Sequence, residues 1–434
     1  MVAAILFISF AVLLLMGAPI AVCLGTSSVV AMIVQGAGRP LDTVMSSLPM
    51  IVSASTSKFV LLAIPFFILA GNIMEKAGIS EKLIKLAEAC VGHIRGGLAI
   101  VCVIVACFFA AISGSGPATV AALGVIIVPA MIKSGYKPAF SAALMAAAGA
   151  IGVIIPPSIT FVVYGSIADT SIGDLFIAGL VPGLLMGFAL MVVALLVGRR
   201  SNLKTLPKAS RKERWLAFKD AFWGLMMPVI ILGGIYGGFF TPTEAAAVSC
   251  VYALVVGCFI YRNLSAKQIW RSLCEISVRV SSMLTIVCVA TAMAWFVSSS
   301  GLAKTIAEAV LAGFSSKIAL LTVINILLFI LGCLIDPTSI ILLTCPIIIP
   351  ITQSLGMSSV AVGAFMIMNI AVGMVTPPFA GTLYVANQIA GEKSIAPITL
   401  KLWPYIVLMF AITLLVAYVP DISLMLPKFL GMTI

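Results

Sequence analysis

Apolar runs of about 20 residues recur along the whole chain, and each is long enough to cross the hydrocarbon core of a bilayer as a helix. Only 9% of the 434 residues are charged, against roughly 25% in a soluble domain. This scarcity of charge excludes a water-soluble enzyme and predicts an all-α polytopic membrane protein. The runs lie near residues 2–34, 51–74, 97–132, 138–167, 174–198, 221–240, 244–261, 277–298, 318–350, 358–390 and 397–420.

The first run, residues 2–34, lacks a basic leader and is longer than the apolar part of a signal peptide, so we expect one retained membrane span. Three charged connecting segments, 75–93, 263–275 and 301–314, are expected to form amphipathic helices at the interface or against a scaffold. The ten cysteines show no paired metal-ligand spacing, so we expect no cofactor other than a coupling ion.

Basic residues are concentrated in one segment of the chain. Eight of the 25 lysines and arginines lie between Arg199 and Lys219. Short basic loops mark the cytoplasmic side of a membrane protein, so we expect loop 199–219 to be cytoplasmic. The net charge of +11 therefore indicates topology and contact with the lipid bilayer, not with nucleic acid.

Four apolar runs are interrupted where proline, glycine and serine gather. Proline removes a backbone donor and glycine weakens a helix, so these places are expected to unwind within the membrane. The interruptions predict re-entrant hairpins over 97–132 and 318–350 and broken helices over 138–167 and 358–390. They lie at Ser113–Pro117, at Gly149–Pro157, at Asp336–Pro337 and at Thr376–Pro378.

The interruptions repeat at an offset of 221 residues, which maps Pro129 to Pro350, Gly152 to Gly373 and Pro156-Pro157 to Pro377-Pro378. Five apolar runs separate the two predicted hairpins, and an odd number of crossings gives the copies opposite orientations. Paired, interrupted segments in inverted repeats are typical of secondary transporters, with the site at the repeat interface.

Two inverted repeats are therefore predicted, at residues 1–220 and 221–434. Each contains scaffold helices, amphipathic arms, one hairpin and one broken helix, and the first also contains the basic loop.

Unwound segments expose carbonyl and hydroxyl oxygens, which are the ligands that a hard cation such as Na⁺ prefers. We therefore predict two related cation sites with the substrate between them. The alternative is that these small residues only allow close helix packing. The predicted cation ligands are Ser113, Gly114, Ser115, Gly152, Pro156 and Ser158 in the first repeat and Asp336, Thr338, Gly373, Thr376 and Pro377 in the second. The predicted substrate contacts are Ser115, Gly116, Thr119, Pro157, Ser339, Asn369 and Pro378.

Two acidic residues allow structural explanations as well. Asp336 is the favoured ionisable residue within an apolar segment, as a cation ligand or hairpin cap; the less favoured alternative is an ordinary N-cap before Pro337. Glu244 follows Thr241 at the spacing of a capping box, so we expect it to start a helix. The chain has no phosphate-binding loop and no series of buried acids, so coupling to an ion gradient is favoured.

Several segments resemble the large membrane subunit of the tripartite ATP-independent periplasmic (TRAP) transporters. They are spread over nearly the whole chain, and the Pro-Pro interruptions and FTPTEAA are the most specific. The matching segments are Gly17–Ile20, Ser113–Thr119, Gly152–Ser158, Gly234–Val248 (GIYGGFFTPTEAAAV) and Gly373–Gly381.

The resemblance implies an elevator-type transporter of the bacterial inner membrane with a scaffold and a mobile transport domain. It also implies coupling to Na⁺, a periplasmic substrate-binding protein, and a separate small four-helix membrane subunit. The substrates implied are small organic anions such as C4-dicarboxylates, sialic acid and related carboxylates.

Two other interpretations compete with sodium-coupled uptake of an organic acid. One is a stand-alone ion-coupled anion symporter or antiporter that needs no binding protein. The other, an intramembrane enzyme or assembly scaffold, would be favoured if changes at Ser115, Asp336 and Thr376 left transport intact.

Overall fold

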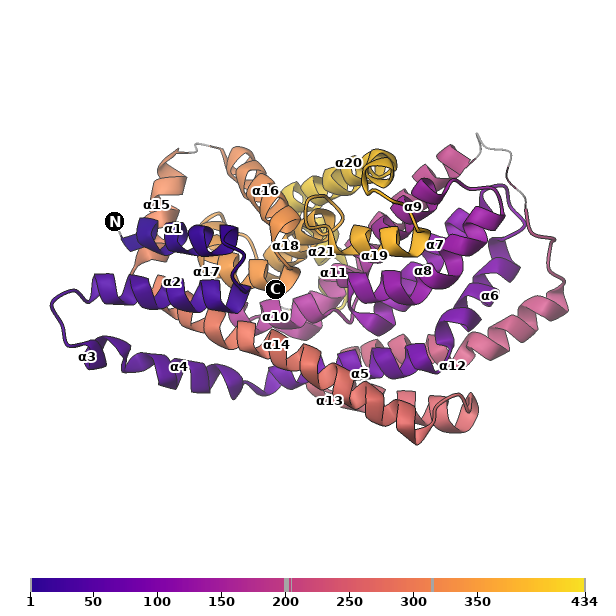
Figure 1. Cartoon of the computed structure of the whole chain (residues 1–434), viewed down its shortest axis with the longest axis horizontal. Coiled ribbons are helices and arrows are strands. Elements are labelled where there is room, and N and C mark those ends of the chain that lie inside the picture. Colours follow the sequence, from indigo (N-terminus) through magenta and orange to yellow (C-terminus); the bar gives the residue numbers. More distant parts are fainter. Residues whose placement is uncertain (1, 199–202, 204, 314–315, 433–434) are drawn as a thin grey trace.

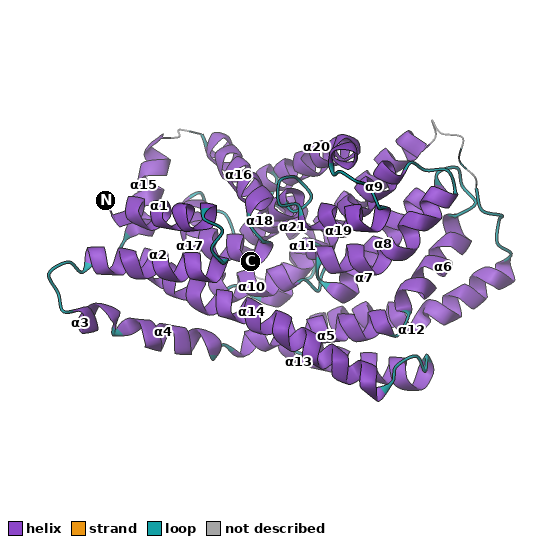
Figure 2. Cartoon of the chain, viewed as in Figure 1, coloured by secondary structure: helices purple, strands orange, loops and turns teal. Residues whose placement is uncertain are grey.

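The computed structural model describes residues 2–198, 203, 205–313 and 316–432, and in that part of the chain the regular structure is entirely helical (Figure 1, Figure 2). The α-helices are α1 Val2–Leu15, α2 Ile20–Gln35, α3 Leu41–Met45, α4 Ser47–Thr56, α5 Ala63–Lys76, α6 Ile79–Val91, α7 Gly97–Ser113, α8 Gly116–Lys133, α9 Pro138–Ala150, α10 Ile159–Ala168, α11 Ile172–Gly198, α12 Arg211–Tyr236, α13 Pro242–Val255, α14 Ala266–Ser299, α15 Leu302–Gly313, α16 Lys317–Leu334, α17 Pro337–Ser354, α18 Ser359–Gly373, α19 Gly381–Ala390, α20 Ala396–Tyr418 and α21 Asp421–Phe429. Short 3₁₀ turns (η1 Phe59–Leu62 and η2 Ile151–Val153) and one π turn (η3 Val256–Ile260) complete them.

Nine helical segments of the described chain are long and apolar enough to cross a membrane. The all-α, multi-pass membrane fold predicted from the apolar runs is therefore confirmed. A buried apolar core runs through the bundle, and its alanines and glycines allow the backbones of neighbouring helices to approach closely.

The first apolar run is not the single span expected from its length. It forms α1 and α2, which pack against each other around a turn at Met16–Pro19. Gly17 takes a left-handed backbone conformation with φ of 80°, and Pro19 disfavours a helical conformation at Ala18. These two residues end α1, so the expectation of one span from residues 2 to 34 was wrong.

Two predicted connecting segments also differ from expectation. Residues 263–275 do not form a separate amphipathic helix, because α14 continues without a break from Ala266 through the following apolar run. Residues 211–219 of the predicted basic loop belong to α12, which begins at a capping box between Ser210 and Glu213. Residues 199–202 and 204 of that segment lie outside the described residues.

Other local predictions hold. The amphipathic helices expected over 75–93 and 301–314 are present as α6 and α15, and each follows a glycine with positive φ, Gly78 or Gly301. The Thr241 backbone N–H donates to Oε2 of Glu244 at 2.8 Å, and the Glu244 N–H donates to Oγ1 of Thr241 at 3.3 Å. The predicted capping box therefore starts α13.

The four predicted interruptions recur in matched pairs. The hairpin of α7 and α8 corresponds to that of α16 and α17, and the broken helix of α9 and α10 corresponds to that of α18 and α19. Both Pro-Pro bonds, at residues 156–157 and 377–378, are cis. The division between residues 220 and 221 lies within α12 and stays a prediction.

Candidate substrate and cation sites

The tip of the first hairpin is a compact group of hydroxyl and carbonyl oxygens. α7 ends at Ser113, Gly114 turns the chain with φ of 60°, and α8 begins after Ser115. The Oγ atoms of Ser113 and Thr119 lie 2.8 Å apart, and the Thr119 hydroxyl donates to the Ser115 carbonyl at 2.8 Å. Ser113 and Thr119 are buried, so these oxygens are fixed by one another within the protein.

The broken helix of the first repeat packs directly on this tip. A Cβ atom added to Gly152 would lie 2.9 Å from the Ser115 carbonyl oxygen, and one added to Gly114 would lie 2.8 Å from that of Pro157. The hydroxyl of Ser158, which is fully buried, donates to the Val153 carbonyl at 2.6 Å. The structure thus brings together predicted site residues that lie some 40 positions apart in sequence. They are Ser113, Gly114, Ser115, Thr119, Gly152, Pro157 and Ser158.

The second hairpin tip is built differently, around a carboxylate. Asp336 caps α17 by accepting from the Ser339 N–H at 3.1 Å and from the Ser339 hydroxyl at 2.5 Å. This geometry agrees with both the hairpin-cap and the ordinary N-cap interpretations of Asp336. Ser339, a predicted substrate contact, is 2% exposed, and its hydroxyl donates its hydrogen bond to Asp336.

The second tip also lies against its broken helix. The Phe379 N–H donates to the Cys333 carbonyl at 3.0 Å, as the Ile159 N–H does to Gly114 in the first repeat at 3.5 Å. A Cβ atom added to Gly373 would lie only 2.4 Å from Cα of Gly332. The Thr376 hydroxyl donates to the Val372 carbonyl at 2.9 Å, beside the predicted ligand Pro377.

Three of the predicted site residues make contacts other than those between a hairpin tip and its broken helix described above. Asn369 is fully buried in α18 and donates through its side-chain amide to Oδ1 of Asn325 in α16. Pro156 lines a separate apolar cavity of about 330 Å³ between α7, α11 and α12. The Pro378 carbonyl accepts a hydrogen bond from the Tyr384 hydroxyl at 3.0 Å.

A cavity of about 260 Å³ lies where the two hairpin tips meet α5 and α14. The hairpins contribute Ser113–Ser115, Pro117, Ala118, Pro337 and Thr338, and the first broken helix contributes Val153, Ile159 and Thr160. Of the predicted site residues, Ser113, Gly114, Ser115 and Thr338 therefore share one cavity. α5 contributes Asn72 and Glu75, and α14 contributes Arg279.

Sequence reasoning missed Asn72, Glu75 and Arg279, since it left the transport path mainly to uncharged residues and Asp336. Glu75 was placed in an amphipathic connecting segment, and Arg279 was passed over in the run 277–298. A signal was present, because Arg271, Glu275 and Arg279 recur every four residues, which is one face of a helix.

Asp336 lines a second cavity, of about 530 Å³. The turn between α1 and α2 forms one of its walls with residues 17–20, and the second hairpin forms another with Gly332 and Leu334–Pro337. It meets the first cavity at Pro117, Pro337 and Met374, which line both.

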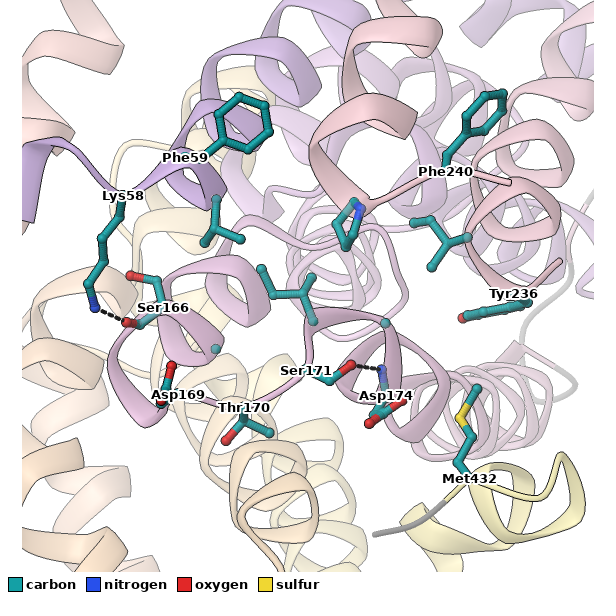
Figure 3. A pocket seen from close by; sticks show the side chains of 16 residues that line it. Lys58, Phe59, Ser166, Asp169, Thr170, Ser171, Asp174, Tyr236, Phe240 and Met432 are labelled. Carbon is teal, nitrogen blue, oxygen red and sulfur yellow. Dashed lines mark hydrogen bonds between the residues drawn. The ribbon is translucent and has the colours of Figure 1, made fainter. Parts of the chain in front are cut away.

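A larger cavity of about 710 Å³ lies away from the hairpin tips, at the end of α10 (Figure 3). At one edge of it Lys58 donates to the Ser166 carbonyl at 2.5 Å, with Asp169 at the end of α10 nearby, while Asp174 of α11 lines another part of the wall. In the described chain, none of the predicted site residues lines this cavity.

Comparison with known proteins identifies the family. Residues 7–422 match the family described as tripartite ATP-independent periplasmic transporter, DctM component. A C4-dicarboxylate TRAP transporter large permease of Pseudomonas aeruginosa is 43% identical, over 87% of this chain and 88% of that protein. A sialic acid TRAP transporter large permease of Vibrio cholerae is 38% identical, over 86% of this chain and 87% of that protein.

Two solved transporters share the fold at low sequence identity. The YdaH transporter of Alcanivorax borkumensis aligns with a TM-score of 0.62 at 14% identity, covering 90% of this chain and 89% of that one. MtrF of Neisseria gonorrhoeae aligns with a TM-score of 0.63 at 12% identity, covering 92% and 94%. The family match, the two permease relatives and the paired hairpins agree: the chain belongs to the DctM component family of TRAP transporters and is a transport protein, as the sequence motifs predicted.

Proposed function

We propose that this chain drives sodium-coupled uptake of a small organic acid across the bacterial inner membrane by an elevator mechanism. The observation that carries the proposal is the cavity of about 260 Å³ that both hairpin tips line together with α5 and α14. We call it the central cavity. A substrate held there would touch both repeats at once, which is where secondary transporters built from repeats bind their cargo.

Sodium coupling is supported by the chemistry of the two hairpin contacts. In the first repeat, hydroxyl and carbonyl oxygens of Ser113, Ser115, Thr119 and Ser158 gather beside Gly152. In the second, the proposed ligands are Asp336, Thr338, Thr376 and Pro377, and Gly373 packs against Gly332 of the hairpin. Oxygen ligands of this kind suit Na⁺, and each charge that enters gains roughly 2.3 kcal/mol per 100 mV of membrane potential.

The elevator mechanism is supported by the division of the helices into two groups, the hairpin and broken-helix units and the helices that lie beside them. α7–α10 and α16–α19 form two hairpin and broken-helix units that pack on each other. α5, α13 and α14 run along one side of those units (Figure 1). In this proposal the hairpin units move with the substrate, and the helices beside them form the stationary scaffold.

The partners and the substrate class follow from the family and from the names of the relatives. Permeases for a C4-dicarboxylate, sialic acid and 2,3-diketo-L-gulonate are among the similar proteins. We propose that a periplasmic binding protein delivers an organic acid of this kind to the chain, and that a small membrane subunit completes the assembly.

Reconstitution tests this function against the stand-alone alternative. The purified chain is placed in proteoliposomes with radiolabelled organic acids, with and without a small TRAP membrane subunit and a periplasmic binding protein. We expect uptake only with an inward sodium gradient and with the binding protein present. Sodium-driven uptake by the chain alone would support a stand-alone symporter and contradict the tripartite proposal.

Topology can be tested independently of transport. Ser210 precedes α12, which is long and apolar enough to cross a membrane once and ends at Tyr236, beside the cavity of about 710 Å³ that Ser171 also lines. With residues 199–219 in the cytoplasm, a Ser210→Cys variant should react with an impermeant maleimide only in inverted vesicles, and Ser171→Cys only in spheroplasts. Both substitutions are made with the native cysteines replaced by alanine, and labelling on the reversed faces would overturn the orientation.

A further inference from the structure

The central cavity contains one basic and one acidic side chain that do not neutralise each other directly. Of the residues that line it, Glu75 and Arg279 alone are charged, Glu75 being half-buried and Arg279 exposed at the rim. Within the described chain, neither side chain takes part in an ion pair or a hydrogen bond. Their neighbours differ in this respect, because Glu275 pairs with Lys76 at 3.0 Å and with Arg271 at 2.9 Å.

A third group in the cavity also lacks a partner. Oδ1 of Asn72 is buried and accepts no hydrogen bond in the described chain. Asn72 lies one helical turn before Glu75 on α5, and both residues line the cavity. The wall formed by α5 and α14 therefore offers one guanidinium, which donates, and two acceptors, a carboxylate and an amide oxygen.

Polar groups that lack hydrogen-bond partners in the protein indicate which chemical groups a ligand must carry to bind them. A guanidinium matches a carboxylate, often through two parallel hydrogen bonds. A carboxylate and an amide oxygen require hydrogen-bond donors, and leaving them desolvated without a donor is unfavourable. A second carboxylate at that end of the ligand would instead face the negative charge of Glu75.

We propose that the cavity selects a carboxylate that carries a hydroxyl or ammonium group at its other end, over an unsubstituted dicarboxylate. In the state that this structure represents, Arg279 binds the carboxylate, and Glu75 with Asn72 accepts from the donor group. These three residues lie on the proposed scaffold, so they select the ligand before the hairpin units carry it away from them. This inference rests on the proposed function, since it takes the cavity to be the substrate site, and it narrows the class of organic acid.

A matched series of four-carbon acids tests this selection. Butyrate, 4-hydroxybutyrate, 4-aminobutyrate and succinate differ only in the group at the end opposite the first carboxylate. Binding to the full chain in nanodiscs is measured by calorimetry at one saturating sodium concentration. We expect the hydroxy and amino acids to bind at least about tenfold more tightly than succinate, because the Coulomb repulsion from Glu75 acts on succinate alone.

Variants assign the selection to the two charged residues. Glu75→Gln removes the repulsion, so we expect it to raise succinate binding relative to 4-aminobutyrate by about tenfold or more. A residue with a purely structural role would not reverse a preference in this way.

Arg279→Gln should weaken binding of all four acids, while Arg279→Lys should keep their order of affinity. Arg271→Gln is the matched control, because Arg271 lies two turns earlier on α14, does not line the cavity and should leave all four affinities unchanged.

The results separate this inference from the proposed function. Succinate binding as tightly as 4-hydroxybutyrate, no change of preference in Glu75→Gln, or no binding of any of the four acids would overturn the inference. Sodium-driven uptake in the reconstituted system is measured separately, and its presence alongside any of those results would leave the proposed function standing. Loss of sodium-driven uptake with the binding order intact would overturn the proposed function instead.

Discussion

At the scale of single residues, the polar link between Asn325 and Asn369 joins the second hairpin to its broken helix. Both side chains are fully buried, and Asn369 donates to Oδ1 of Asn325, whose own amide donates to the Leu321 carbonyl at 2.6 Å. At the offset of 221 residues, the first repeat has Ile104 and Ala148 at these positions. The two repeats therefore share a backbone arrangement, but only the second has this side-chain hydrogen bond between its hairpin and its broken helix.

Removing one side of this pair should destabilise the protein. Asn369→Leu leaves Oδ1 of Asn325 buried without a donor, and we expect a loss of about 1 kcal/mol in the free energy of unfolding, because interhelical hydrogen bonds in membrane proteins are of that order. The double variant Asn325→Leu/Asn369→Leu should recover part of the loss. Thermal unfolding in detergent measures both.

Thr344→Val is the control for the asparagine pair, because among the described residues the Thr344 hydroxyl bonds to the Ile340 carbonyl of its own helix and to no other helix. We expect this substitution to change stability less than Asn369→Leu. Equal losses in the two single variants, with no recovery in the double variant, would contradict a specific interhelical link.

The same scale shows where sequence reasoning stopped. Asn369 could be singled out because it lies just before a predicted interruption, but its partner Asn325 stands in an unbroken apolar helix with no local signal. Arg279 and Glu75 are about 200 positions apart, so no spacing rule places them on one cavity. Side chains brought together by tertiary packing alone cannot be paired from one sequence.

At the scale of helices, the interruptions were predictable because proline and glycine act locally on the backbone. The hairpins, the broken helices and the caps of α12–α14 all follow from residues within a few positions of the break. The first run was misread for the opposite reason, since its hydropathy continues across Gly17 and Pro19 while its backbone does not. Hydropathy gives the extent of an apolar run, and only backbone chemistry gives the number of helices within it.

The contact between α16 and α18 depends on the absence of a side chain at Gly373. In Gly373→Ala, the added Cβ would lie 2.4 Å from Cα of Gly332, which is backbone and cannot rotate away. We expect the second hairpin to shift, at a cost of about 1–3 kcal/mol, and sodium-dependent uptake to be lost while the protein still inserts. Uptake in proteoliposomes and the amount of monodisperse protein measure the two effects.

Gly233→Ala on α12 is the control for this contact, because a Cβ there would meet no atom within 4 Å. It should leave both uptake and insertion unchanged. Full sodium dependence in Gly373→Ala would show that the second cation site does not require close packing of hairpin and broken helix.

At the scale of the whole molecule, a hydrogen bond joins the proposed scaffold to the proposed mobile hairpin units. It lies at the cavity that Tyr236 also lines, at the end of α12 opposite the basic segment. Lys58 precedes η1, which leads directly into α5 of the proposed scaffold, and its ammonium group donates to the Ser166 carbonyl near the end of α10 (Figure 3). α10 belongs to the first broken helix, which packs on the second hairpin through α17. If the hairpin units move as an elevator, this contact must break during every transport cycle.

A covalent link across this contact should therefore stop transport. In a background with the native cysteines replaced by alanine, Lys58→Cys and Ser166→Cys are joined by a short thiol reagent that a reductant can cleave. We expect sodium-driven uptake to fall to the level of empty vesicles on linking and to return on reduction, because a fixed contact prevents relative motion of the two bodies. Each single variant, treated with the same reagent, should keep its uptake. Undiminished uptake by the linked protein would mean that Lys58 and α10 stay together throughout the cycle, which would exclude the proposed division between scaffold and transport domain.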